Sequence, residues 1–362
     1  MIMHANTSPA AAPLRVMVVD DSAVVRGLIT RILQADTRIE VAASCSNGEM
    51  AVVLAARKAM DVIILDIEMP VMDGLSALPK LLAANPHARI IMASTLTQRN
   101  AAVSLRALTL GAADYIAKPT TERLNANEEF RRDLIQKVIA LGQRKMPIRG
   151  AIVPKSVSRQ LPLRSAPARH PRIIAIGSST GGPQALLTLL GGLSASVTCP
   201  IVIAQHMPAT FTTVLAQHLA HASGRPCAEA ATGMELKPGS IYLAPGDYHM
   251  QVMREGGTYI AQLSQTPPEN YCRPSVDPLL RSVAQSFGGE SCAVMLTGMG
   301  SDGCKGALVM AAAGAPIIAQ DEATSVVWGM PGAVANAGIC SAILPLPKIA
   351  AYLAGLCARD AA

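Results

Sequence analysis

Three polar residues that each follow an apolar, strand-like run carry the strongest signal for chemistry in this chain. Ser179 comes after "RIIAIGS" and before "TGGPQALLTLL", His206 ends "PIVIAQH", and Asp302 lies in the turn "LTGMGSDG". In a parallel sheet, strand ends that are distant in sequence meet at one edge. A serine, a histidine and an acid at such an edge could serve as nucleophile, base and orienting group, although their spacing alone does not show that they meet.

Ser179 also has two simpler interpretations. The segment "GSSTG" has the G-x-S-x-G pattern between a strand and a helix, the context in which a nucleophilic serine is presented. The same corner could bind a phosphate at the helix N-terminus, or the serine could simply cap the helix. Dinucleotide binding requires an acid at the end of the next strand, which ends in Gln205 and His206, and no P-loop G-K-[ST] is present. Nucleotide binding is therefore disfavoured and capping stays open. Asp302 could likewise belong to a plain Asp-Gly turn.

Composition limits the class of protein. With 362 residues, half of them hydrophobic, the chain is long enough for roughly two to three packed domains. Aromatic residues make up only 3%, which disfavours a surface that stacks on nucleic-acid bases. No apolar run reaches the ~20 residues of a membrane helix, and residues 1–14 lack the pattern of a signal peptide. Eight cysteines without C-x-x-C spacing indicate reduced thiols, so we expect a cytoplasmic protein that is not embedded in a membrane.

The net charge of +6 is concentrated in one stretch. Residues 143–172 contain eight lysines and arginines, five prolines and no acidic residue. Outside this stretch, 23 basic residues stand against 25 acidic ones, so the remainder of the chain is close to neutral. A proline-rich basic stretch without apolar periodicity predicts a solvated linker between two domains, and we expect no specific binding of nucleic acid.

The first half alternates strand and helix patterns, which predicts a parallel sheet covered on both faces. Polar residues follow its strands: Asp20 and Asp21 the first, and Asp66, Ser94 and Lys118 three later ones. Three carboxylates at one sheet edge would repel one another without a cation, and oxygen ligands of this kind suit Mg²⁺. A lysine and a hydroxyl beside them could bind a phosphoryl group. Singly, each has an ordinary alternative, such as helix capping or surface exposure.

Taken in order, "DDS", "LDIEMPVMDG", "ST" and "KP" resemble the receiver domain of bacterial response regulators. The resemblance implies a flavodoxin-like receiver that is phosphorylated on an aspartate with Mg²⁺ as cofactor. The implied roles are phosphoacceptor for Asp66, Mg²⁺ ligands for Asp20, Asp21, Asp66 and the carbonyl of Glu68, and switch positions for Ser94, Lys118 and Tyr115.

The second half is also α/β in pattern and resembles the catalytic domain of the chemotaxis methylesterase family. The matching stretches are "IGSSTGGPQAL", "IAQHMP", "YLAPGDYHM", "RPSVDPLLRSVA", "LTGMGSDG" and "QDEATSVVWGMPGAV". The resemblance implies that Ser179 is the nucleophile, His206 the general base and acid, and Asp302 the residue that orients His206. It also implies that Thr180 and the backbone amide of Met299 stand near the oxyanion, with no cofactor in this domain.

Together the two halves predict an α/β protein of two doubly wound domains with mainly parallel sheets, a flavodoxin-like receiver and a Rossmann-like serine hydrolase. The expected boundaries are an N-terminal tail over 1–13, a receiver over 14–138, a linker over 139–171 and a catalytic domain over 172–358. By resemblance, a chemotaxis histidine kinase phosphorylates the protein, which then demethylates glutamate methyl esters and deamidates glutamines on chemoreceptors. The alternative is a non-enzymatic response regulator whose second half binds DNA or protein. That half shows no compact basic three-helix module, which disfavours the alternative.

Overall fold

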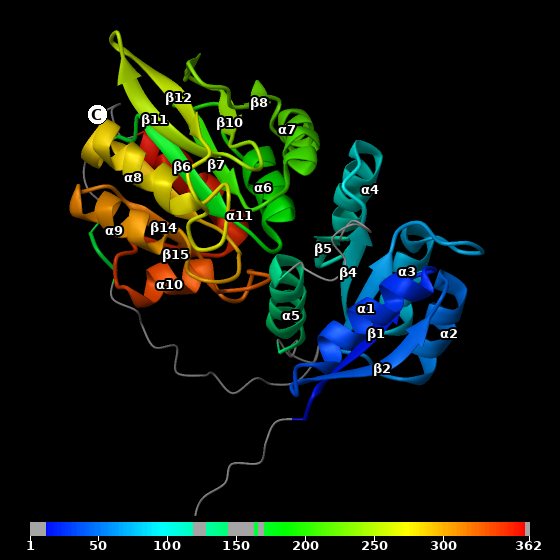
Figure 1. Ribbon diagram of the computed structural model, residues 1–362. Coiled ribbons are helices and arrows are strands. Elements are labelled where there is room, and N and C mark those ends of the chain that lie inside the picture. Colours follow the sequence, from blue (N-terminus) through cyan, green and yellow to red (C-terminus); the bar gives the residue numbers. More distant parts are fainter. Residues whose placement is uncertain (1–11, 119–127, 144–162, 166–169, 359–362) are drawn as a thin grey trace, which may run out of the picture. The chain divides into compact units, whose positions relative to one another are not determined.

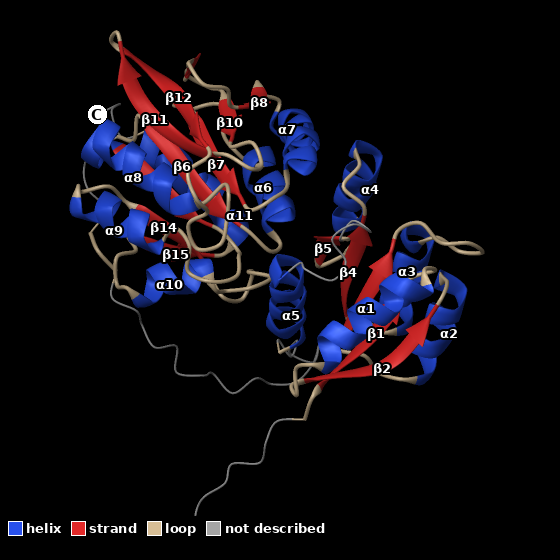
Figure 2. Ribbon diagram, viewed as in Figure 1, coloured by secondary structure: helices blue, strands red, loops and turns tan. Residues whose placement is uncertain are grey.

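The computed structural model describes residues 12–118, 128–143, 163–165 and 170–358 (Figure 1). The predicted tail over 1–13 and the predicted linker over 139–171 lie largely outside these residues. Two compact units are present, and each has its own parallel sheet (Figure 2). The predicted fold class, two mainly parallel α/β domains, is therefore confirmed.

The first sheet has five parallel strands in the order β2-β1-β3-β4-β5. Its strands are β1 (Leu14–Val19), β2 (Ile39–Cys45), β3 (Val62–Asp66), β4 (Arg89–Ser94) and β5 (Asp114–Ala117). The central strands are apolar almost throughout and buried, as expected for a sheet covered on both faces. The edge strand β2 was not predicted, because it consists largely of small, partly exposed residues and has a weak apolar pattern.

Five helices accompany these strands along the chain, and side chains cap the first three. They are α1 (Ala23–Gln34), α2 (Gly48–Arg57), α3 (Gly74–Ala84), α4 (Gln98–Thr109) and α5 (Glu128–Gly142). Ser22, Asn47 and Asp73 accept hydrogen bonds from the first-turn amides of α1, α2 and α3, which fixes where the chain turns away from each strand end. Helix α5 runs past the receiver boundary predicted at residue 138, because Leu141 continues its buried face.

The second sheet has seven parallel strands in the order β15-β14-β13-β6-β7-β10-β8. Its strands are β6 (Ile173–Ser178), β7 (Ile201–Gln205), β8 (Cys227–Glu229), β10 (Ile241–Leu243), β13 (Ser291–Met295), β14 (Ile317–Gln320) and β15 (Ala342–Leu344). The chain starts in the middle of this sheet, at β6, builds outwards through β7, and later returns to β13 on the other side of β6. Such a reversal of strand order opens a crevice at the carboxyl ends of the central strands.

Helices cover both faces of this sheet (Figure 2). One group packs α6 (Gly182–Gly191) against α7 (Ala209–Ser223) and α11 (Leu346–Cys357). The other group packs α8 (Val276–Phe287), with the short 3₁₀ turn Gly288–Glu290 after it, against α9 (Cys304–Ala312), which in turn contacts α10 (Met330–Asn336). The predicted Rossmann-like layering is thus present, with its core between sheet and helices.

A small antiparallel sheet was not predicted. It consists of β9 (Met234–Glu235), β11 (His249–Glu255) and β12 (Thr258–Ser264) in the order β11-β12-β9. Strands β11 and β12 form a hairpin through Gly256 and Gly257, both with positive φ. The hairpin is partly exposed and mixes polar with apolar residues, so it lacks the continuous apolar run by which the buried strands were recognised.

Candidate active site

Ser179 lies at the corner between β6 and α6. The N-cap of α6 is Gly181, with φ 74°, and no side chain caps the helix. The capping interpretation of Ser179 is therefore wrong, and its hydroxyl is left for another use. The corner requires glycine at two positions: Gly181 because of its positive φ, and Gly182 because a Cβ there would collide with the side chain of Gln205.

Gln205 joins this corner to the neighbouring strand. Its Nε2 donates to the carbonyl oxygens of Ser179, at 3.0 Å, and of His206, at 3.1 Å. Its Oε1 accepts from Ser178 Oγ at 2.6 Å, and the side chain is buried. Because this one amide spans the ends of β6 and β7, it fixes the backbones of Ser179 and His206 relative to each other. In the sequence, Gln205 was notable only because it stands where dinucleotide binding requires an acid, and this role was not predicted.

The other neighbour of β6 supplies the opposite wall of the corner. Thr297, two residues after β13, accepts a hydrogen bond from Ser179 N through its carbonyl oxygen, at 3.0 Å. A Cβ at Gly298 would lie 2.9 Å from Ser179 Cβ, so this position passes close to the serine. Met299 follows directly. The Thr180 hydroxyl is buried and has no hydrogen-bond partner among the described residues, whereas the Thr180 carbonyl accepts from Thr297. A buried hydroxyl beside Ser179 is thus available to a ligand.

His206 and Asp302 contact each other directly. His206 Nε2 lies 2.7 Å from Asp302 Oδ2, although the two residues are 96 positions apart in the chain. Asp302 is buried and accepts further hydrogen bonds from five protein groups: Asn270 Nδ2, Ser275 Oγ and the backbone amides of Val276, Asp277 and Gly303. An acid in a plain Asp-Gly turn would not collect so many donors. These donors stabilise an ionised carboxylate in a fixed orientation toward His206.

The charges of this pair follow from their surroundings. Burial opposes ionisation of Asp302, but its hydrogen bond to His206 and the charge of His206 outweigh burial and hold the Asp302 pKa well below its usual range. For His206, burial likewise opposes a charge, yet Cys272 and Asp302 overcome it and raise the pKa to about 10. An ionised Asp302 keeps a proton on His206 Nε2, so Nδ1 is the nitrogen that exchanges protons with other groups.

Two further side chains of this site carry no recognisable sequence signal. Asn270 Nδ2 donates to Asp302 Oδ1, at 2.7 Å, and to Asp277 Oδ2, at 2.9 Å, so that one amide bridges two buried carboxylates. Cys272 Sγ lies 3.4 Å from His206 Nδ1. Among the described residues, Ser179 Oγ forms no hydrogen bond to His206. The structure thus places Ser179, His206 and Asp302 at one sheet edge, and the Cys272 thiol contacts the His206 imidazole.

The acidic residues of the first unit also meet. Asp20, Asp21 and Asp66 each offer a carboxylate oxygen, and these atoms lie within 4.8 Å of one another. Lys118 Nζ lies 2.7 Å from Asp20 Oδ2 and 2.6 Å from Asp66 Oδ1. Burial raises the pKa of Asp66 to about 6, although Lys118 counteracts it. Three carboxylates against one lysine leave excess negative charge, and an all-oxygen donor set fits a hard divalent cation such as Mg²⁺.

The remaining predicted receiver residues lie on the strands of this sheet or in the turns that follow them. Ser94 is buried at the end of β4, and Tyr115 is buried on β5, with Lys137 Nζ 5.0 Å from the centre of its ring. Glu68 is exposed in the turn after β3, two positions beyond Asp66. Ser94 and Glu68 lie at or just beyond the carboxyl ends of their strands, whereas Tyr115 is the second residue of β5, and the roles of all three stay predictions.

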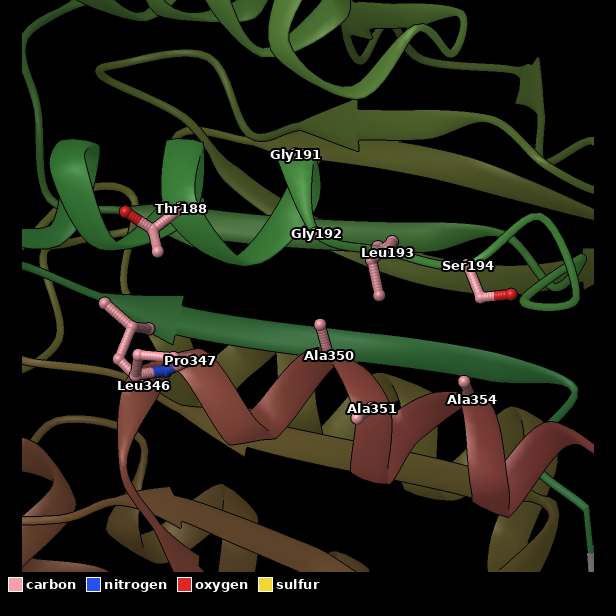
Figure 3. A pocket seen from close by; sticks show the side chains of 10 residues that line it. All are labelled: Thr188, Gly191, Gly192, Leu193, Ser194, Leu346, Pro347, Ala350, Ala351 and Ala354. Carbon is pink, nitrogen blue, oxygen red and sulfur yellow. The ribbon is translucent and has the colours of Figure 1, made fainter.

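A groove of about 460 Å³ lies elsewhere, between the C-terminal end of α6 and helix α11 (Figure 3). Its lining is small or apolar and includes Gly192, Leu193, Ala350 and Ala354. None of its lining residues belongs to the Ser179 corner, and the lining begins on α6 at Thr188, roughly 9 Å along the helix from Gly182 at 1.5 Å per residue. The groove is therefore not part of the site. In the described part of the chain, no helix is long and apolar enough to cross a membrane.

A receiver-type sheet with a cluster of acidic residues at its edge, followed by a parallel sheet with serine, histidine and aspartate at one edge, defines a response regulator with an enzymatic output domain. Comparison with known families agrees: residues 16–127 match the response regulator receiver domain, and residues 174–353 match the family described as CheB methylesterase. The chain belongs to the CheB methylesterase family. A non-enzymatic output domain is not supported.

Similar proteins match almost the whole chain. A protein-glutamate methylesterase/protein-glutamine glutaminase of Paramagnetospirillum magneticum is 52% identical over 98% of this chain and 99% of its own. One from Azospirillum brasilense is 52% identical over 99% of this chain and 96% of its own. The crystal structure of the Thermotoga maritima CheB methylesterase catalytic domain matches with a TM-score of 0.50 and 41% identity, covering 51% of this chain and 98% of that domain.

Proposed function

We propose that this protein hydrolyses methyl esters of glutamate side chains on chemoreceptors, releasing methanol, and deamidates certain receptor glutamines to glutamate. The observation that carries the proposal is the contact of His206 with Asp302 at the sheet edge where Ser179 is partly exposed. The relatives that match the full chain carry the same two activities in their names. We assign the roles of nucleophile, general base and orienting acid to Ser179, His206 and Asp302.

In this mechanism His206 Nδ1 takes the proton of Ser179 Oγ as the oxygen attacks the ester carbonyl carbon. The tetrahedral oxyanion accepts hydrogen bonds from the Thr180 hydroxyl and the Met299 amide. When the intermediate collapses, the C–O bond to the methoxy group breaks, and the proton on Nδ1 passes to the leaving oxygen to give methanol. Water attacks the acyl-serine by the same proton path and leaves a free glutamate. With a glutamine side chain, ammonia leaves instead.

We propose that the receiver controls this activity through phosphorylation of Asp66 by a chemotaxis histidine kinase. Asp20, Asp21, Asp66 and the Glu68 carbonyl would hold Mg²⁺, which neutralises the charge of the incoming phosphoryl group when bound. Lys118 contacts Asp66 and would bind a phosphoryl oxygen, while Ser94 and Tyr115 respond to it. All eight cysteines are free, which supports a reducing compartment, and we assign the protein to the cytoplasm.

Replacement of Asp66 tests the control. In Asp66→Asn, a small acyl phosphate with Mg²⁺ is expected to produce no stimulation of methanol release from methylated receptor, because the amide cannot accept the phosphoryl group. The wild-type chain is expected to respond by about 5-fold or more, the usual range for coupling between two sites. Glu49→Gln, an exposed carboxylate on α2, is the matched control and keeps the response. Stimulation of Asp66→Asn equal to wild type would exclude Asp66 as the acceptor.

Removal of the receiver tests the direction of control. By resemblance, the unphosphorylated receiver restrains the catalytic domain, so a chain that starts at residue 143, after α5, is expected to show basal methanol release about 5-fold or more above the full chain. The homologous Thermotoga maritima catalytic domain crystallised by itself, which supports folding of the shortened chain. The measurement is methanol release without phosphodonor at equal folded concentration. Unchanged or lower activity would contradict restraint by the receiver.

A further inference from the structure

The thiol of Cys272 occupies the nitrogen of His206 that the reaction needs. His206 Nε2 is bound to Asp302 at 2.7 Å, and Cys272 Sγ lies 3.4 Å from Nδ1, on the other side of the ring. The contacts therefore run in a line from a thiol through an imidazole to a buried carboxylate. This is the order of a nucleophile, base and acid, but its first member here is Cys272 and not Ser179.

The position of Cys272 is fixed by the segment 269–275. Asn270 and Tyr271 both have positive φ, 51° and 63°, and Cys272 N donates to Glu269 O at 2.9 Å, which closes a tight turn. Both ends of the segment are tied to Asp302, through Asn270 Nδ2 and Ser275 Oγ. Since the carboxylate that orients His206 also anchors the turn that carries Cys272, the thiol and the imidazole are held together by the same group.

Ser179 and Cys272 cannot use Nδ1 at the same time, because that atom has one lone pair when Nε2 carries a proton. We propose that Cys272 is a positioning residue, which holds His206 Nδ1 in the ester-free enzyme and releases it to Ser179 Oγ when the ester binds. In the ester-free state Cys272 Sγ faces Nδ1 at 3.4 Å. Ester binding displaces the thiol from Nδ1 and frees the lone pair for the proton of Ser179. This inference rests on the proposed roles of Ser179 and His206.

The charges around the imidazole set the expected effect on pH dependence. In the described part of the chain, the ionisable groups that act on the His206 ring are Asp302, from the turn after β13, and Cys272, from the segment 269–275; both favour the protonated ring. A protonated His206 cannot accept the proton of Ser179. The value of kcat/KM, which depends on the protonation of the ester-free enzyme, therefore increases as pH rises through the His206 pKa. Loss of Cys272 removes one of the two stabilising partners and moves this increase to lower pH.

The first test is the pH profile of kcat/KM for methanol release by full-length Cys272→Ala and Cys272→Ser. Cys272→Ala is expected to shift the acid limb by about one pH unit to lower pH, which raises kcat/KM on that limb about 10-fold. Cys272→Ser, whose hydroxyl replaces the sulfur beside Nδ1, is expected to shift the limb in the same direction. A uniform loss of kcat/KM at every pH in both variants, with the limb unmoved, would overturn the proposal.

The second test does not require esterase activity. Iodoacetamide is expected to alkylate Cys272 at pH 7 at least about 5-fold faster in wild type than in His206→Gln, as measured by mass spectrometry of the Cys272 peptide, because a histidine in contact with a thiol promotes its reaction with alkylating agents. Cys304, also partly exposed, serves as the internal control with an equal rate in both proteins. Equal rates at Cys272 would overturn the proposal. A wild-type protein that fails to release methanol yet shows the His206-dependent rate would contradict the assigned activity and support the thiol–imidazole contact.

Discussion

Ser179→Ala is expected to abolish methanol release from methylated receptor, with a decrease in kcat of at least about 10³-fold. The variant retains the fold of the corner, because the serine makes its structural contacts through its backbone: its amide donates to Thr297 and its carbonyl accepts from Gln205. The hydroxyl has no structural partner among the described residues. Loss of activity without loss of stability is therefore the expected signature of a nucleophile at this position.

Three measurements separate this result from misfolding or a broken signalling step. The melting temperature of Ser179→Ala should stay close to that of wild type, and phosphorylation of Asp66 by a small acyl phosphate should proceed at the wild-type rate. Ser196→Ala, at an exposed serine in the loop after α6, provides the matched control and keeps full activity. Turnover of Ser179→Ala within 10-fold of wild type would contradict the assignment of Ser179.

The strands that position the site were predictable because each is encoded by a short, continuous run of residues. The strands ending at Ser178, Gln205 and Met295 are buried apolar runs followed by polar or glycine residues, and the reversal of order around β6 places their ends side by side. The rule that strand ends meet at one edge therefore predicted that Ser179, His206 and Asp302 could be neighbours. It did not predict which atoms touch.

The residues that hold the site were not predictable in this way. Gln205 acts through its side-chain amide on two backbone carbonyls, and Asn270 bridges carboxylates that lie seven and 32 positions further along the chain. Such contacts depend on tertiary packing and leave no periodicity in the sequence. The segment 269–275 also lies outside any helix or strand, so the proximity of Cys272 to His206 required the structure.

These contacts hold the base and the acid of the catalytic edge more firmly than the nucleophile, a difference that we call the hierarchy of the site. Gln205 fixes the backbones of two central strands, and Asp302, with its five donors besides His206, fixes the ring. The Ser179 hydroxyl, by contrast, has no structural partner among the described residues. A site arranged in this way holds its base and acid rigidly and leaves the nucleophile to be engaged by substrate, which is the form of preorganisation that lowers the reorganisation cost of catalysis.

The strongest test of this hierarchy is Asp302→Asn, for which we expect kcat to decrease by about 10³- to 10⁴-fold, the effect of the same change in a serine protease triad. The carboxylate accepts hydrogen bonds at both oxygens, so an amide nitrogen at either place meets a donor. If the new amide nitrogen replaces Oδ2, it faces Val276 N–H and His206 Nε2. This forces the ring proton to Nδ1 and removes the base. At the Oδ1 place it faces Asn270 Nδ2 and Gly303 N–H, and the ring keeps its tautomer but loses its counter-charge.

Either arrangement leaves a buried donor unpaired, which costs about 1–3 kcal/mol, so the melting temperature of Asp302→Asn should also decrease. Loss of the Asp302 carboxylate thus lowers both activity and melting temperature, whereas Ser179→Ala lowers activity alone. Comparison of the two variants therefore distinguishes a positioning group from the reacting group. Glu255→Gln, at the exposed end of β11, is the matched change of acid to amide and should alter neither activity nor stability. If Asp302→Asn retains methanol release within 10-fold of wild type, His206 does not depend on this carboxylate, and the donors around Asp302 serve the fold alone.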